Sequence, residues 1–137
     1  MKHALQLVFI VGIAFCAVAV FTRGYRADHS NSRTGPESSE PVLRNSAMTR
    51  GRTLIAERNC GTCHTIPGVA GATGTVAAPL SRFAQRTFVA GVIPNTHENL
   101  AAWIANPQSI DPKTAMPNLG ITPDESRDMA AYLESLR

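Results

Sequence analysis

The sequence is poor in aromatic residues, with five Phe, two Tyr and one Trp among 137 residues. A small domain with so few large side chains has difficulty building a stable core unaided, and such domains often rely on a metal, disulfides or a cofactor. The three cysteines are too few and too unevenly spaced for a disulfide framework. The composition therefore favours a metal or a prosthetic group as part of the core.

A strong charge of one sign is also missing from most of the chain. The formal net charge is +3, but residues 48–137 contain eight Lys or Arg and seven Asp or Glu, so the excess lies nearer the N-terminus. There is no basic stripe with interleaved aromatic residues, which argues against a nucleic-acid partner. With no repeat or low-complexity tract, this length predicts a single folded domain.

One long hydrophobic run is present. Residues 4–21, ALQLVFIVGIAFCAVAVF, carry no formal charge, and only Gln6 is polar. This is about the length that crosses a ~30 Å hydrocarbon core as a helix. We predict that residues 1–21 form a single-pass anchor in the cell membrane, with the rest of the chain on the outer, periplasmic side. A cleavable signal peptide is the alternative, because AVA at 17–19 has the form of a processing site, and cleavage would leave a soluble periplasmic protein.

The chain after this run divides into a tether and a domain. Residues 22–47 are polar, rich in Ser, Gly and Pro, and without apolar periodicity, which predicts a flexible tether. From Met48 the pattern becomes helical, and residues 48–137 are predicted to form the domain. No alternating strand pattern is present, so the expected fold class is all-α, with short helices joined by loops that contain glycine and proline.

Two helices have clear boundary signals. One is predicted to be capped by Asn95, with Glu98 three residues later, and to stop before Pro107. The other starts at Thr122, with proline next and an acidic residue at the third helical position. Its apolar residues fall on one face: Met129, Tyr132, Leu133 and Leu136.

The stretch RNCGTCHT at 58–65 places two thiols and an imidazole within five residues. A zinc site normally needs four ligands in two spaced pairs, whereas only His64 and a distant His97 follow this cysteine pair. A thioredoxin-like dithiol needs a βαβ context, which is not predicted. Attachment of haem uses all three residues: Cys60 and Cys63 form thioethers with the vinyl groups, and His64 becomes the proximal iron ligand. We favour haem; the zinc and dithiol alternatives predict a colourless protein.

Met116 is the candidate for the second axial ligand. It lies in a loop between Pro112 and Pro117, which stiffen the backbone around a side chain that must point at a metal. Met129 has helical spacing and is expected in the core. His97 is an alternative ligand that would give a lower reduction potential. An open sixth position would instead indicate a haem peroxidase or sensor.

Residues 48–137 resemble the class I monohaem cytochrome c family. The resemblance is carried by Gly51 and Ile55 with Met129 and Tyr132, by Leu100, Trp103, Asn106 and Pro107, and by Pro112, Thr114 and Met116. It implies a cytochrome c fold of short helices around one covalently bound haem c. It also implies that Trp103 lies beside the haem on the methionine side, and that Arg86 and Thr114 interact with its propionates.

The sequence differs from the usual pattern of this family after the haem motif. The family usually reads Gly-Pro-x-Leu there, and a carbonyl of that stretch accepts the proton of the proximal imidazole. Residues 77–80 read Ala-Ala-Pro-Leu, with the proline one place late. The carbonyl of Ala78 is the candidate acceptor, because a backbone carbonyl can serve whatever its side chain.

The run NTHENLAAWIANPQSIDPKTAMPNLG at 95–120 is similar to the cytochrome domain fused to subunit II of some bacterial haem–copper oxidases. This implies an electron-transfer protein rather than an enzyme by itself, acting in a respiratory chain. The expected partners are the membrane, a terminal oxidase that receives the electron, and an upstream quinol–cytochrome c reductase. A haem peroxidase or sensor with a dissociable sixth ligand is the alternative function.

Overall fold

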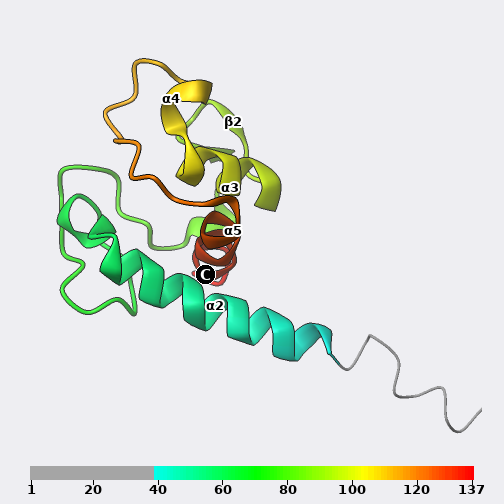
Figure 1. The fold of residues 1–137 in the computed structure, drawn as a ribbon. Helices are drawn as coiled ribbons and strands as arrows, with labels where there is room; N and C mark the ends of the chain where they lie inside the picture. Colours follow the sequence, from blue (N-terminus) through cyan, green and yellow to red (C-terminus); the bar gives the residue numbers. More distant parts are fainter. Residues whose placement is uncertain (1–38) are drawn as a thin grey trace, which may run out of the picture. The chain divides into compact units, whose positions relative to one another are not determined.

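The computed structural model describes residues 39–137. The predicted anchor, residues 1–21, and residues 22–38 of the predicted tether lie outside the described residues. The described part is mostly helical, as predicted (Figure 1). Its helices are α2 (Glu40–Glu57), α3 (His97–Ala105), α4 (Pro107–Ile110) and α5 (Pro123–Leu133), with 3₁₀ turns η2 (Cys60–Thr62) and η3 (Phe83–Gln85). None of the helices in this range is both long enough and apolar enough to span a bilayer.

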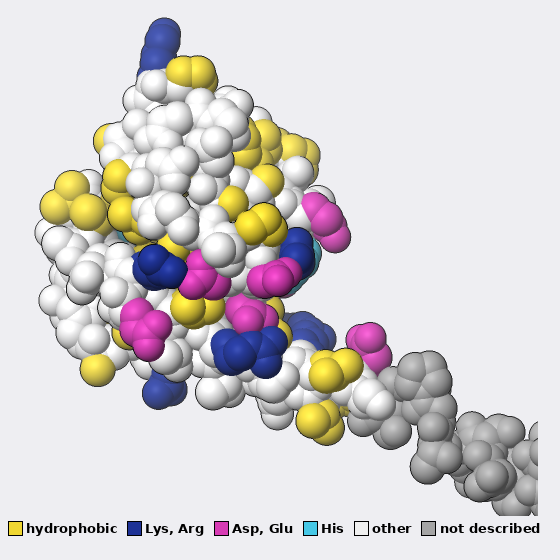
Figure 2. All heavy atoms as spheres, in the orientation of Figure 1, with side chains coloured by type: hydrophobic (Ala, Val, Ile, Leu, Met, Phe, Trp, Pro, Cys, Tyr) yellow, Lys and Arg dark blue, Asp and Glu magenta, His cyan; other side chains and the backbone are white. Residues whose placement is uncertain are grey.

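Helix α2 begins earlier than the sequence analysis predicted. It starts at Glu40, so residues 40–47 are helical and the prediction of a tether that reaches residue 47 is wrong for this part. Pro41 lies in the first turn, where its missing N–H is tolerated, and no further helix breaker precedes Gly51. Val42 and Leu43 are 67% and 63% exposed (Figure 2 shows such apolar side chains on the outer part of α2). Because these residues do not reach the core, this part of the helix lacks the periodicity that the prediction relied on.

Helices α2 and α5 cross at a glycine. A Cβ atom added to Gly51 would lie 1.9 Å from the carbonyl oxygen of Asp128, so only glycine allows this approach. An ion pair from Arg50 to Asp128 at 2.7 Å joins the same two helices, and Arg58, directly after α2, pairs with Glu125 at 2.6 Å. The two helices therefore meet at Gly51, which lies against the backbone of Asp128 and Met129.

The boundary of α5 was predicted correctly and that of α3 only in part. Thr122 and Glu125 form a capping box at the start of α5, with a proline in the first turn. Helix α3 ends at Ala105, before Pro107, as predicted, but its N-cap is Thr96, whose hydroxyl accepts from the backbone of Asn99. Asn95 is not the cap, because its side-chain amide donates to the carbonyls of Phe83 and Arg86 instead. Tertiary contacts thus decided between two neighbouring residues with good capping side chains.

A small sheet was not predicted. Strand β1 (Phe88–Val89) pairs antiparallel with β2 (Ile93–Pro94), with Phe88 opposite Pro94 and Val89 opposite Ile93. Ala90 and Gly91 have positive φ angles, which allow the tight connection. Two residues per strand are too few to give an alternating pattern in the sequence.

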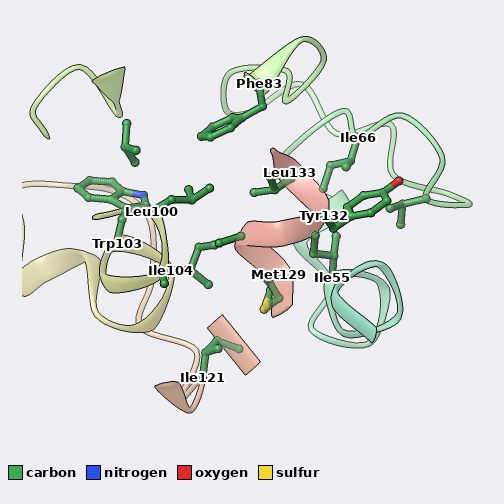
Figure 3. Packing of buried hydrophobic residues seen from close by; sticks show 14 of the residues in the cluster. Ile55, Ile66, Phe83, Leu100, Trp103, Ile104, Ile121, Met129, Tyr132 and Leu133 are labelled. Carbon is green, nitrogen blue, oxygen red and sulfur yellow. The ribbon is translucent and has the colours of Figure 1, made fainter. Parts of the chain in front are cut away.

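The core lies between α2, α3, α5 and the loops that follow the cysteines. Figure 3 shows Phe83, Leu100 and Leu133 pointing toward one another, with Tyr132 farther out. The Tyr132 hydroxyl donates to the carbonyl oxygen of Pro67 at 2.6 Å, which ties α5 to the loop after the cysteine motif. Met129, Tyr132 and Leu133 are buried as predicted, while Leu136 packs against the core from beyond the end of α5.

Candidate haem-binding site

All the predicted site residues line one cavity of about 470 Å³. They are Cys60, Cys63, His64, Arg86, Trp103, Thr114 and Met116. They come from four separate parts of the chain, and the walls between them are mainly apolar, formed by side chains that include Ile55, Leu100, Ile104 and Leu133. The volume lies in the range of about 300–1,000 Å³ that is typical of small-molecule and cofactor sites. The fold therefore brings the predicted site together.

The turn after α2 directs the two thiols and the imidazole into this cavity. Asn59 adopts a left-handed conformation that ends the helix, and the backbone N–H groups of Cys63 and His64 both donate to the carbonyl of Cys60. Gly61 lies against the backbone of Ala72, where an added Cβ would come within 2.6 Å of its Cα. The glycine between the cysteines is thus required by close packing of the next loop.

Cys60 does not have the character of a reactive thiol. Both cysteines of the motif are partly buried, and no disulfide joins them. Burial raises the pKa of the Cys60 thiol above its ordinary value. Reactive dithiols have a lowered thiol pKa, because the thiolate is the nucleophile. The structure therefore gives no support to the dithiol alternative.

His64 is oriented by the carbonyl group that the sequence analysis named. Its Nδ1 atom lies 2.7 Å from the carbonyl oxygen of Ala78. A carbonyl oxygen only accepts, so Nδ1 carries the proton and Nε2 is left with a free lone pair for a metal. Two backbone hydrogen bonds hold this loop beside the motif, from Ala77 N–H to Cys63 and from Leu80 N–H to Thr65.

Met116 is held at three points. The indole Nε1–H of Trp103 donates to its Sδ atom at 3.1 Å, and the side-chain amide of Gln108 donates to its carbonyl oxygen at 2.6 Å. Its own N–H donates to the hydroxyl of Thr114 at 3.2 Å. Sequence reasoning missed Gln108, because a glutamine in a four-residue helix matches no motif. Met129 lies in the core, as expected, and is 3% exposed.

Arg86 and Thr114 line the cavity, but both have partners within the protein. The Arg86 guanidinium donates to the carbonyl of Pro79 and lies 5.0 Å from the centre of the Phe83 ring. The Thr114 hydroxyl accepts the hydrogen bond from Met116. Their predicted contacts with haem propionates remain predictions.

The structure separates His97 from the site. Its Nδ1 atom lies 3.1 Å from a carboxylate oxygen of Glu134, and it lines a different cleft together with Arg50, Asp124 and Arg127. It does not line the cavity that contains His64. The alternative of His97 as sixth ligand is therefore wrong.

The structure also gives no support to the zinc alternative. Residues 39–137 contain no cluster of three or more His, Cys, Asp or Glu side chains placed to hold an ion.

Residues 48–137 match the Cytochrome c family. The chain belongs to this family. A cytochrome c domain indicates electron transfer, and the family implies a covalently bound haem. The cavity fits that group, since it combines two thiols, an imidazole with Nε2 free, a thioether and apolar walls.

Two relatives are cytochrome c oxidase subunit 2 proteins. The chain is 36% identical over 103 residues to that of Alkalihalophilus pseudofirmus, covering 74% of this chain and 28% of the relative. It is 35% identical over 92 residues to that of Bacillus subtilis, covering 64% of this chain and 26% of the relative. The chain thus spans only about a quarter of the length of these relatives. No solved structure gives a significant match.

Proposed function

We propose that this protein is a one-electron carrier of a respiratory chain, anchored in the membrane, that delivers electrons to a terminal oxidase or serves as its cytochrome subunit. The observation that carries the proposal is the cavity in which an oriented His64 and a hydrogen-bonded Met116 meet two cysteines. The similarity to oxidase subunit 2 proteins supports the choice of partner. When bound, haem would supply reversible one-electron chemistry, and ligation by His and Met favours a high reduction potential.

The roles of the chain's own residues follow from the site. Cys60 and Cys63 would hold the haem covalently, while the Ala78 carbonyl keeps the His64 ring in one orientation and tautomer. Met116 would supply a second ligand to the iron through its thioether sulfur. If His64 and Met116 both hold the iron, a small substrate would find no free position on it, which favours a carrier over a peroxidase or sensor.

The early start of α2 shortens the predicted tether. If residues 1–21 are an anchor, the polar stretch between it and α2 is residues 22–39, eighteen residues rather than twenty-six. If this stretch is flexible, as its composition predicts, its typical reach would be about 21–25 Å. The haem domain would then stay close to the outer face of the cell membrane, between an upstream quinol–cytochrome c reductase and the oxidase.

The test uses the full chain, produced in a host that attaches haem to exported proteins. We expect a coloured protein whose haem stays on the chain after denaturation, and whose reduced form is rapidly reoxidised by membranes that contain a terminal oxidase. The double variant Cys60→Ser/Cys63→Ser is the matched control and should lose the covalent pigment. A covalent haem that oxidase-containing membranes do not reoxidise would overturn the proposed partner, and a colourless mature protein would overturn the function.

A further inference from the structure

The loop that carries Met116 packs little against other protein side chains, and its residues 114–117 and Leu119 line the cavity. In residues 111–120 most side chains are exposed, and Met116 itself is only partly buried. The hydrogen bonds within the loop are local: the backbone N–H groups of Lys113 and Thr114 donate to Asp111, and that of Met116 to Thr114. Such bonds shape the loop but do not fix it to the rest of the protein.

Gln108 supplies a link from outside the loop. It lies on α4, and its side-chain N–H donates to the carbonyl oxygen of Met116 at 2.6 Å. Helix α4 is a firm support, because Pro107 at its start is fully buried in the core. Among the hydrogen bonds of the described residues, only those from Gln108 and Trp103 reach Met116 from outside its loop. Trp103 holds the sulfur, whereas Gln108 holds the backbone next to the side chain.

Resting on the proposed function, we propose that Gln108 is a positioning residue for the sixth ligand. By fixing the peptide group of Met116 it limits rotation of the segment that presents the thioether, and so keeps the sulfur on the iron. The hydrogen bond to the carbonyl does not involve the sulfur, so it remains available when the sulfur is coordinated. A glutamine without contact to the haem would thereby influence the strength of axial ligation.

The test measures how easily Met116 is displaced in the haem-loaded full chain. Two variants remove the donor: Gln108→Leu, of similar size, and Gln108→Glu, of the same shape. Imidazole binds ferric haem only after displacing Met116, so its apparent affinity reports the hold on the ligand. We expect both variants to bind imidazole more tightly by about two- to tenfold, the effect of losing one net hydrogen bond. Their far-red Met–iron absorption should weaken, and their reduction potential should fall.

Ser109→Ala is the matched control. Ser109 is the exposed neighbour on α4, and its hydroxyl donates to Asn106 rather than to the methionine loop. We expect it to leave imidazole affinity unchanged, and all three variants to unfold within a few degrees of the parent protein. An equal rise in imidazole affinity in Ser109→Ala would overturn the proposal, because it would indicate general damage to the helix.

The outcomes separate this inference from the proposed function. If the parent protein has covalent haem but no Met–iron band, the proposed ligation fails, and the inference with it. If the parent protein has the band and imidazole affinity is unchanged in the Gln108 variants, only the inference is wrong. Should Gln108→Leu not accumulate as folded protein, Gln108→Glu decides the question, since it preserves the shape of the side chain.

Discussion

The imidazole Nδ1 atom of His64 and the carbonyl oxygen of Ala78 form a hydrogen bond of 2.7 Å, although Ala78 stands where the family usually has proline. The hydrogen bond can form without proline because its acceptor is a backbone carbonyl. The backbone N–H groups of Ala77 and Leu80 hold the loop in place by donating to the carbonyls of Cys63 and Thr65, the residues directly before and after His64. The protein itself thus fixes the orientation of the imidazole, as a metal-binding histidine requires.

Replacing Met116 should change the haem, whereas replacing His97 should not. In the haem-loaded protein, Met116→Ala removes the thioether, so we expect loss of the far-red Met–iron band and a shift toward a high-spin spectrum. His97 is paired with Glu134 outside the cavity, so His97→Ala should leave the spectrum unchanged. Absorption spectra of the oxidised proteins measure both. A normal band in Met116→Ala would show that another residue is the ligand.

Gly51→Ala should destabilise the protein strongly. The new Cβ would lie 1.9 Å from the backbone carbonyl oxygen of Asp128, and backbone cannot move away as a flexible side chain can. We expect the free energy of unfolding to fall by about 2–3 kcal/mol or more, the upper range for overpacking. Thr53→Ala, on the exposed face of the same helix, should change it by less than about 0.5 kcal/mol. Denaturant unfolding of the haem-loaded proteins tests the difference, and equal effects of the two variants would contradict the close crossing.

Glu125 should make stability depend on pH in the acid range. The backbone N–H of Thr122, followed by the Arg58 side chain, holds the pKa of this carboxyl below its ordinary value of 4.5. A lowered pKa contributes stability that is fully present above pH 4.5 and is lost as the pH falls through the folded-state value. Glu125→Gln lacks this contribution.

The measurement for Glu125 is the melting temperature of both proteins as a function of pH. We expect Glu125→Gln to melt lower than the parent protein at neutral pH and the gap to shrink progressively below pH 4.5. Asp124→Asn, which changes the neighbouring carboxyl outside the capping box, is the control. If the difference in melting temperature between the two proteins grew toward acid pH, the ionised Glu125 carboxylate would not be the stabilising form, and the prediction would be wrong.

Local sequence signals correctly predicted those structural features that depend only on residues close together in the sequence. The start of α5 was correct because Thr122, Pro123 and Glu125 act within one turn of the helix. The predicted N-cap of α3 was wrong because Asn95 and Thr96 both have side chains that can cap a helix. Which of them does so depends on the carbonyls of Phe83 and Arg86, which accept hydrogen bonds from the Asn95 side chain. The start of α2 was placed too late because the prediction followed apolar periodicity, which a solvent-exposed helical segment does not need.

By itself the sequence determined the chemistry of this protein. It contains a cysteine–histidine motif, a methionine flanked by prolines at position 116 and a glycine at position 51. Few functions other than haem binding require this combination of residues. Only the tertiary structure decided that the Ala78 carbonyl reaches the His64 ring, that His97 faces another cleft, and that Gln108 holds the backbone of Met116. The physical reason is the separation along the sequence. A motif reflects interactions between residues close in sequence, whereas these contacts join segments that come together only when the hydrophobic core forms.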